Sequence, residues 1–189
     1  MSQPTTTLAR IKAAAPCASS WRRVLRKVGG LSKYGEDASI TVRQIVEAMD
    51  LEDALWCLRT MPEHDARWRL LAVRYARRVQ HLMKDPRSVA ALDVAERHAH
   101  GTATDAELSV AGGAARAARD ANDWADWAWA AEAVATAVMD AARDAYIIAA
   151  GCAARAAMHV AGGASAAAWA AEREWQTDEL IRICEDGKS

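Results

Sequence analysis

Residues 65–84 read DARWRLLAVRYARRVQHLMK, and they carry the clearest helical pattern in this 189-residue chain. At 100° per residue, the larger apolar side chains fall within about 60° of one line along a helix. These residues are Trp68, Leu71, Ala72, Tyr75, Val79, Leu82 and Met83. The pattern predicts one helix over residues 65–84 with a buried apolar face.

The remaining circumference of this helix is basic. Its cations are Arg67, Arg69, Arg74, Arg77, Arg78 and Lys84, and no acidic residue lies between Asp65 and Asp85. Such cations can pair with the protein's own carboxylates or stay solvated, bind an acidic protein partner, or bind the phosphates of a nucleic acid. All six are therefore candidate partner-binding residues.

Helix-start signals recur on both sides of this stretch. A short basic helix in SSWRRVLRKVGG is expected to open at Ser19 or Ser20 and to stop at Gly29-Gly30. Later starts are predicted from capping residues and from proline at the first helical position. They are Thr41, Asp50, Asp85 with Pro86, and Thr104 with Glu107.

Residues 122–151, NDWADWAWAAEAVATAVMDAARDAYIIAAG, hold a second sustained pattern. Steps of four and three link its apolar stripe, which predicts a packed helix of about 25 residues. Trp129 lies off this stripe, so it is either covered by another helix or exposed as a candidate partner-binding residue. Asp120, Asp123 and Asp126 share one flank, as a solvated helix start or as an acidic surface for a partner.

Composition favours helices throughout. Alanine is abundant, phenylalanine is absent and runs of β-branched residues are sparse. We predict an all-α fold of eight or nine helices, packed as an irregular multi-helix bundle or a short stack of helical pairs. Residues 1–40 are expected to form an N-terminal appendage with the short basic helix, and residues 41–189 a single all-helical domain. Gly112-Gly113 and Gly162-Gly163 are expected to mark a kink, a break or a close helix crossing.

The net charge of −1 conceals two halves of opposite sign. Residues 1–100 hold 17 Lys and Arg against 11 Asp and Glu, whereas residues 101–189 hold 7 against 14. The two halves can attract each other within the fold or present two different faces to partners.

The sequence contains no catalytic constellation, so we expect a protein that is not an enzyme and takes no cofactor. There is no Gly-rich phosphate loop and no His-Glu-x-x-His motif. His98 and His100 point about 160° apart on a helix, so no metal site is expected. The cysteines, which are Cys17, Cys57, Cys152 and Cys184, show no paired spacing and are expected to be reduced thiols of a cytoplasmic protein.

Neither a signal peptide nor a membrane span is expected. The N-terminal residues lack the apolar core of a signal peptide. The Ala-rich run of residues 145–171 contains Arg155 and several glycines, and alanine contributes little to membrane insertion.

The series LEDALWCLRTMPEH, WRLLAVRYARRVQHLM, DPRSVAALDVAERHAHG and TATDAEL resembles the immunity protein family of bacterial polymorphic-toxin systems. The resemblance covers residues 50–184, and similar Ala-rich modules occur in phage. It implies an all-α, non-enzymatic protein that binds and neutralises a toxin, and it carries over no set of functional residues.

The expected function is therefore that of a cytoplasmic, non-catalytic inhibitor that covers a specific protein partner. The partner is a cognate toxin or, if the gene is phage-borne, a host defence complex, as for an anti-CRISPR protein. A further alternative is a nucleic-acid-binding helical protein that uses the arginines of residues 65–84.

Overall fold

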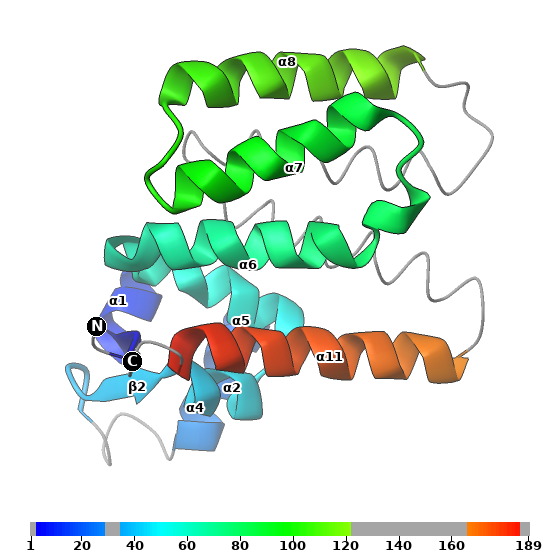
Figure 1. The fold of residues 1–189 in the computed structure, drawn as a ribbon. Coiled ribbons are helices and arrows are strands. Elements are labelled where there is room, and N and C mark those ends of the chain that lie inside the picture. The colour runs from blue at the N-terminus through cyan, green and yellow to red at the C-terminus, as the bar shows by residue number, and fades with distance from the viewer. Residues whose placement is uncertain (1–2, 29–34, 122–165, 186–189) are drawn as a thin grey trace. The chain divides into compact units, whose positions relative to one another are not determined.

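The computed structural model describes residues 3–28, 35–121 and 166–185, in which eight α-helices form (Figure 1). Within these residues the strands form one short two-stranded sheet. The predicted all-α fold is confirmed. The helix predicted in residues 122–151, with Trp129, Asp123 and Asp126, lies outside the described residues, as does Gly162-Gly163.

Contacts within the chain divide it into two compact units. Unit 1 contains Met1–His64 and Thr177–Ser189, and unit 2 contains Asp65–Gln176. One long helix, α11 (Ala166–Glu185), starts in unit 2 and ends in unit 1.

Unit 1 is built from short elements. It begins with β1 (Thr5–Thr7), α1 (Leu8–Ala13) and α2 (Ala18–Val28). It continues with β2 (Ser39–Thr41), α4 (Val42–Ala48), α5 (Leu51–Cys57) and two single 3-10 turns, η1 (Leu58–Thr60) and η2 (Pro62–His64).

The two strands tie the start of the chain into unit 1. β1 pairs antiparallel with β2, with Thr6 opposite Ile40. The Oγ1 atoms of Thr6 and Thr60 are hydrogen-bonded at 2.8 Å, and Leu8 and Ile11 of α1 are fully buried. This pairing holds residues 5–7 beside residues 39–41 within unit 1.

Unit 2 contains α6 (Asp65–Arg78), the 3-10 turn η3 (Gln80–Leu82), α7 (Pro86–Ala99), α8 (Asp105–Ala121) and the first part of α11. α7 packs on both α6 and α8 (Figure 1). As predicted, Trp68, Leu71 and Tyr75 of α6 are fully buried. Burial of each such side chain contributes about 1.5–3 kcal/mol, which makes this face the core of the unit.

Four of the predicted caps start helices, whereas the start predicted at Ser19 or Ser20 is wrong, because α2 already begins at Ala18. Thr41 forms a capping box at α4, and Asp50 caps α5. Asp85 caps α7, which has proline at its first position. Thr104 and Glu107 form the predicted capping box before α8.

α6 is shorter than the helix predicted over residues 65–84. It ends at Arg78, and Val79 follows with a backbone φ of −107° and ψ of 6°. Pro86 disfavours helical backbone at Asp85, so the chain must leave the helix before that residue. Leu82 and Met83 consequently fall out of the helical phase and are only half-buried.

α8 runs through Gly112-Gly113 without interruption, so a break at this pair is excluded. Gly112 is buried, whereas a Cβ placed on Gly113 would meet no atom within 4 Å. Alanines on both sides have the highest helix propensity and carry the helix across the pair.

No described helix combines the length and the apolar character that a bilayer span requires.

Candidate partner-binding surface

The basic residues of α6 are largely engaged within unit 2. Arg77 donates from Nη1 to Oε1 of Gln80 at 2.7 Å, and its Nη2 pairs with the carboxylates of Asp93 and Glu96 on α7. Arg77 therefore joins two neighbouring helices, α6 and α7.

Arg78 is also paired internally. Its Nε lies 3.1 Å from Oε2 of Glu172, a carboxylate that is almost fully buried, and its guanidinium lies 4.9 Å from the ring centroid of Trp175. A buried carboxylate needs such a partner, because an unpaired one would be strongly destabilising. In the structure, Arg77 and Arg78 therefore both form ion pairs with carboxylates of unit 2.

The other predicted cations of α6 differ in exposure. Arg67 is buried, at 7% exposed. Arg69 donates to Nδ1 of His98 at 3.2 Å. Arg74 is half-buried and Lys84 is exposed. The structure thus does not bring the six cations together as one open face.

The predicted acidic residues are described only in part. Asp120 is exposed at the end of α8 and pairs with Arg119 at 3.0 Å. Asp123, Asp126 and Trp129 lie outside the described residues.

Nε2 of His98 lies within hydrogen-bond distance, 2.9 Å, of Oδ1 of Asp105. Among the described residues, no three metal-ligating side chains gather at one place.

A second basic helix, α2, offers a more open surface. Its inner side is anchored by Val24 and Ser20, which are 2% and 4% exposed. Arg22 and Arg26 are exposed on its outer side. Four residues, Ser19, Arg22, Arg23 and Arg26, line an open pocket of about 520 Å³, and we call these four the α2 basic face. Their spacing of three, four and seven places them on one side of the helix.

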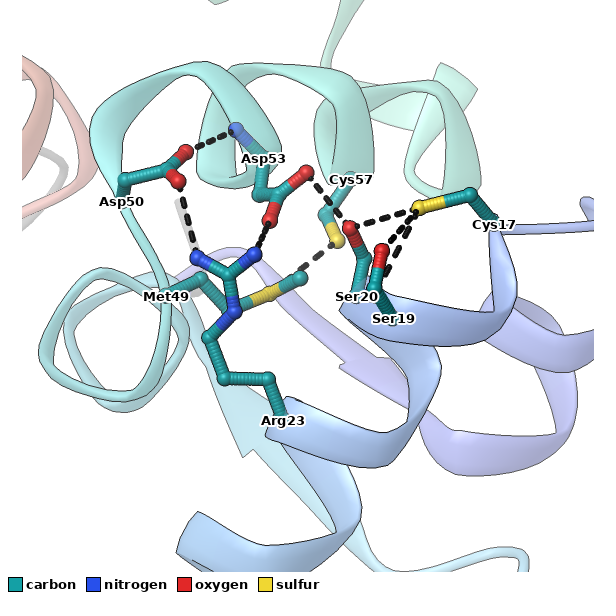
Figure 2. Close-up of polar contacts among 8 residues, drawn as sticks. All are labelled: Cys17, Ser19, Ser20, Arg23, Met49, Asp50, Asp53 and Cys57. Atoms are coloured by element: carbon teal, nitrogen blue, oxygen red, sulfur yellow. Dashed lines mark hydrogen bonds and ion pairs between the residues drawn. The ribbon is translucent and has the colours of Figure 1, made fainter.

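Arg23 fixes this helix to the start of α5 (Figure 2). Its Nη1 lies 2.8 Å from Oδ2 of Asp50, and its Nη2 lies 3.2 Å from Oδ2 of Asp53. The hydrogen bond from Arg23 to Asp50 is the main cause that raises the pKa of Arg23 above its ordinary value. The hydroxyl of Ser20 donates to Oδ1 of Asp53 at 2.8 Å, which adds a second link between the helices.

Arg22 and Arg26 differ from Arg23 in lacking a carboxylate. The Nε of Arg22 donates to the carbonyl of Ala18 at 3.0 Å, and the Nε of Arg26 donates to the carbonyl of Arg22 at 3.5 Å. Neither guanidinium forms an ion pair with any residue that the structure describes. Within the described part of the chain, no carboxylate neutralises these two charges.

Cys17 caps the start of α2. Its Sγ accepts a hydrogen bond from the backbone N–H of Ser20 at 3.4 Å, and the hydroxyls of Ser19 and Ser20 lie 3.1 and 3.0 Å from the same sulfur (Figure 2). Hydrogen bonding from the hydroxyl of Ser19, together with that from the backbone N–H of Ser20, lowers the pKa of the Cys17 thiol to about 7. By contrast, burial raises the pKa of the Cys57 thiol to about 12. Cys17 is the more reactive of these two thiols, because the thiolate is the nucleophile.

The sequence contained a signal for the α2 basic face. No acidic residue lies between Cys17 and Gly35, which is the same feature that marked residues 65–84. What the sequence does not show is which arginines find carboxylates in the fold. Arg77 and Arg78 pair with carboxylates, whereas Arg22 and Arg26 pair with none among the described residues.

Comparison of the chain with protein-family models, with curated proteins and with solved structures finds no match.

Proposed function

We propose that this protein is a non-catalytic inhibitor that binds a specific protein partner through the α2 basic face. The observation that carries the proposal is that Arg22 and Arg26 have no carboxylate partner among the described residues while they line an open pocket. The resemblance to the immunity protein family supports a toxin as the partner. A host defence complex is the alternative if the gene is phage-borne.

The chemistry of this face suits an acidic protein surface. Arginine is enriched among the residues that dominate protein interfaces, and exposed charge accelerates association with a partner of opposite sign. The links from Arg23 and Ser20 to α5 hold α2 in place, so little ordering is required on binding. A preformed face of this kind favours inhibition by surface coverage.

The arginines of α6 provide weaker support for nucleic-acid binding. Binding to a duplex depends on several phosphate contacts, each from an available cation. Arg77 and Arg78 already pair with Asp93, Glu96 and Glu172. We therefore place the binding surface on α2.

The proposal is tested by isolating the partner from the native host and measuring its affinity for purified variants. Arg22→Glu and Arg26→Glu should each weaken binding by about tenfold or more, as expected for charges within an interface. Arg59→Glu is the matched control, because Arg59 is exposed in the same unit and stacks at 4.4 Å over Trp56 without an ion pair to a described carboxylate.

Equal weakening by Arg59→Glu would show only a general effect of charge and would contradict the assignment. If both α2 variants bind the partner with full affinity, the binding surface lies elsewhere on the protein. Turnover of a small molecule with no stoichiometric protein partner would overturn the proposed function itself.

A further inference from the structure

Beside the α2 basic face, the helix α2 carries two apolar side chains, Trp21 and Leu25, which we call the α2 apolar row. The two residues are one turn apart, and both are half-buried. At 100° per residue, an arc of about 140° around the helix contains, in order, Trp21, Leu25, Arg22 and Arg26. Val24, which is buried, lies on the opposite side from Arg22. The outward side of α2 therefore combines an apolar row with two exposed cations.

Trp21 differs from a half-buried tryptophan that is already used within the fold. The guanidinium of Arg59 lies 4.4 Å from the ring centroid of Trp56, which is half-buried in the same unit. Among the residues that the structure describes, the ring of Trp21 has no such contact, and its indole N–H forms no hydrogen bond. Tryptophan is highly buried on average, and it is enriched with arginine among the residues that dominate protein interfaces. Trp21 is therefore suited to contact a partner.

The other sides of α2 are held by unit 1. The helix packs on α4, and Ser20 and Arg23 tie one flank of it to α5 (Figure 2). Trp21 and Leu25 lie on the other flank. Because the helix is already fixed, a partner that covers the α2 apolar row does not have to order it first.

This combination fits a groove of a protein better than a nucleic acid. Amphipathic helices bind such grooves through apolar side chains spaced by three or four residues, as Trp21 and Leu25 are. The charges of Arg22 and Arg26, which no carboxylate among the described residues neutralises, complement acidic side chains at the edge of a groove. A nucleic acid instead requires several phosphate contacts, and Leu25 offers no ring on which a base could stack.

We infer that α2 docks in a groove of the protein partner, with Trp21 and Leu25 on an apolar floor and Arg22 and Arg26 against an acidic edge. The inference rests on the proposed function, since it names the kind of surface that the partner offers to α2. In this interface Trp21 is the anchor, and the two arginines accelerate and orient the association.

The inference is tested by measuring the affinity of the isolated partner for full-chain variants at low salt and in about 1 M NaCl. Trp21→Ala should weaken binding about tenfold or more at both salt concentrations, because salt does not screen apolar contacts. Arg22→Glu should weaken binding at low salt, and its effect should shrink in about 1 M NaCl, where the Debye length is about 3 Å. Trp56→Ala is the matched control and should leave the affinity unchanged, because Arg59 already covers that ring.

The parent chain provides a second measurement that does not depend on the folding of Trp21→Ala, which circular dichroism checks. When the chain is labelled with fluorotryptophan, Trp21→Phe identifies the fluorine NMR signal of Trp21. Addition of the partner should shift this signal and remove its difference between light and heavy water, a difference that requires contact of the ring with solvent. The signal of Trp56 should stay unchanged.

Full affinity of a folded Trp21→Ala variant, or a fluorine signal of Trp21 that the partner leaves unchanged, would overturn the inference. Binding of a single-stranded oligothymidylate that depends on Trp21 and falls steeply with salt would also overturn it, in favour of a nucleic acid.

The same variants separate this inference from the proposed function. If binding of the partner depends on Arg22 and Arg26 but not on Trp21, the groove is wrong and the proposed inhibitor function stands. If the partner ignores all three residues, the binding surface itself has been misplaced.

Discussion

Cys17 and Cys57 show how the surroundings of a cysteine control the pKa and the reactivity of its thiol. Cys17 is exposed and close to two hydroxyls, whereas Cys57 is fully buried. Hydrogen bonds favour the Cys17 thiolate, and burial disfavours the Cys57 thiolate. Their spacing in the sequence predicted reduced thiols but could not rank their reactivity.

Alkylation should separate the two thiols. Because the pKa of Cys17 is lowered to about 7, its reaction with iodoacetamide should rise with pH and reach half its maximal rate near pH 7. Cys57 should remain unmodified in the folded protein, since its pKa is raised to about 12 and its side chain is buried. Peptide mapping by mass spectrometry measures both sites, and Cys17→Ser is the control. A half-maximal rate near the ordinary thiol pKa of 9.0 would contradict the role of the hydrogen bonds to the Cys17 sulfur.

Glu63 provides a pH-dependent contribution to stability. Arg10 donates to both of its carboxylate oxygens, at 2.8 and 2.9 Å, and this hydrogen bonding lowers the pKa of Glu63 to about 2. A depressed carboxyl pKa stabilises the fold above the ordinary value of 4.5 and ceases to do so as the pH falls toward 2. Because both side chains are about half exposed, the pair contributes at most about 1 kcal/mol.

The variant Glu63→Gln tests this contribution. Urea unfolding should show the variant to be less stable than the parent at pH 6, and the difference should shrink steadily between pH 4.5 and 2. A difference that stayed constant over this range would mean that the ion pair is not its source.

At the scale of elements, the sequence predicts helix caps, which depend on neighbouring residues, but it does not predict strand pairs between residues far apart in the chain. Thr41, Asp50 and Thr104 each cap a helix through contacts within three residues, so the sequence predicts them well. β1 and β2 are three residues each, too short for an alternating pattern, and Thr6 pairs with Ile40 far along the chain. The sequence pattern therefore does not predict this sheet.

Gly113 is a site where α8 can be stabilised. It lies inside a continuous helix, and an added Cβ would meet no atom within 4 Å. Gly113→Ala should therefore stabilise the protein by about 1 kcal/mol, through higher helix propensity and a less flexible unfolded chain. Thermal unfolding measures the effect. Gly101→Ala is the contrasting variant and should be destabilising, because Gly101 has a φ of +72°. A lower melting temperature for Gly113→Ala would show that α8 is not continuous at this point.

The hydroxyl of Tyr75 links α6 to the part of α11 that belongs to unit 2, so a variant at this residue tests that packing. Its hydroxyl donates to the backbone carbonyl of Gln176 at 2.6 Å, and its side chain is fully buried. Tyr75→Phe removes the donor and leaves a buried carbonyl without that bond, at a cost of about 1–3 kcal/mol. Chemical denaturation of the variant measures this loss. A variant as stable as the parent would mean that the bond is not formed in solution.

At the scale of the whole molecule, the sequence predicted the class of the fold better than its candidate site. Hydrophobic spacing identified the buried face of α6, including Trp68 and Tyr75. It could not show that Arg78 meets Glu172, which lies 94 residues away. Ion pairs of such long range depend on the fold, so the number of cations on a helix does not reveal how many remain for a partner. The surroundings of Arg22 and Arg26, rather than their positions in the sequence, distinguish them from the arginines of α6.

The composition of unit 1 has a consequence for how the protein is made. Arg43 binds Glu185 through Nε and Nη2 at 2.9 and 2.7 Å, and the buried residues Leu180 and Ile183 belong to the same unit. On the ribosome, the start of unit 1 emerges first and then waits until all of unit 2 has been translated. Unit 2 is contiguous in the chain, so all of its residues are made before the last segment of unit 1. During this interval the unfinished unit 1 exposes apolar side chains that Leu180 and Ile183 have yet to join, so this unit is the part of the nascent chain that depends on a chaperone.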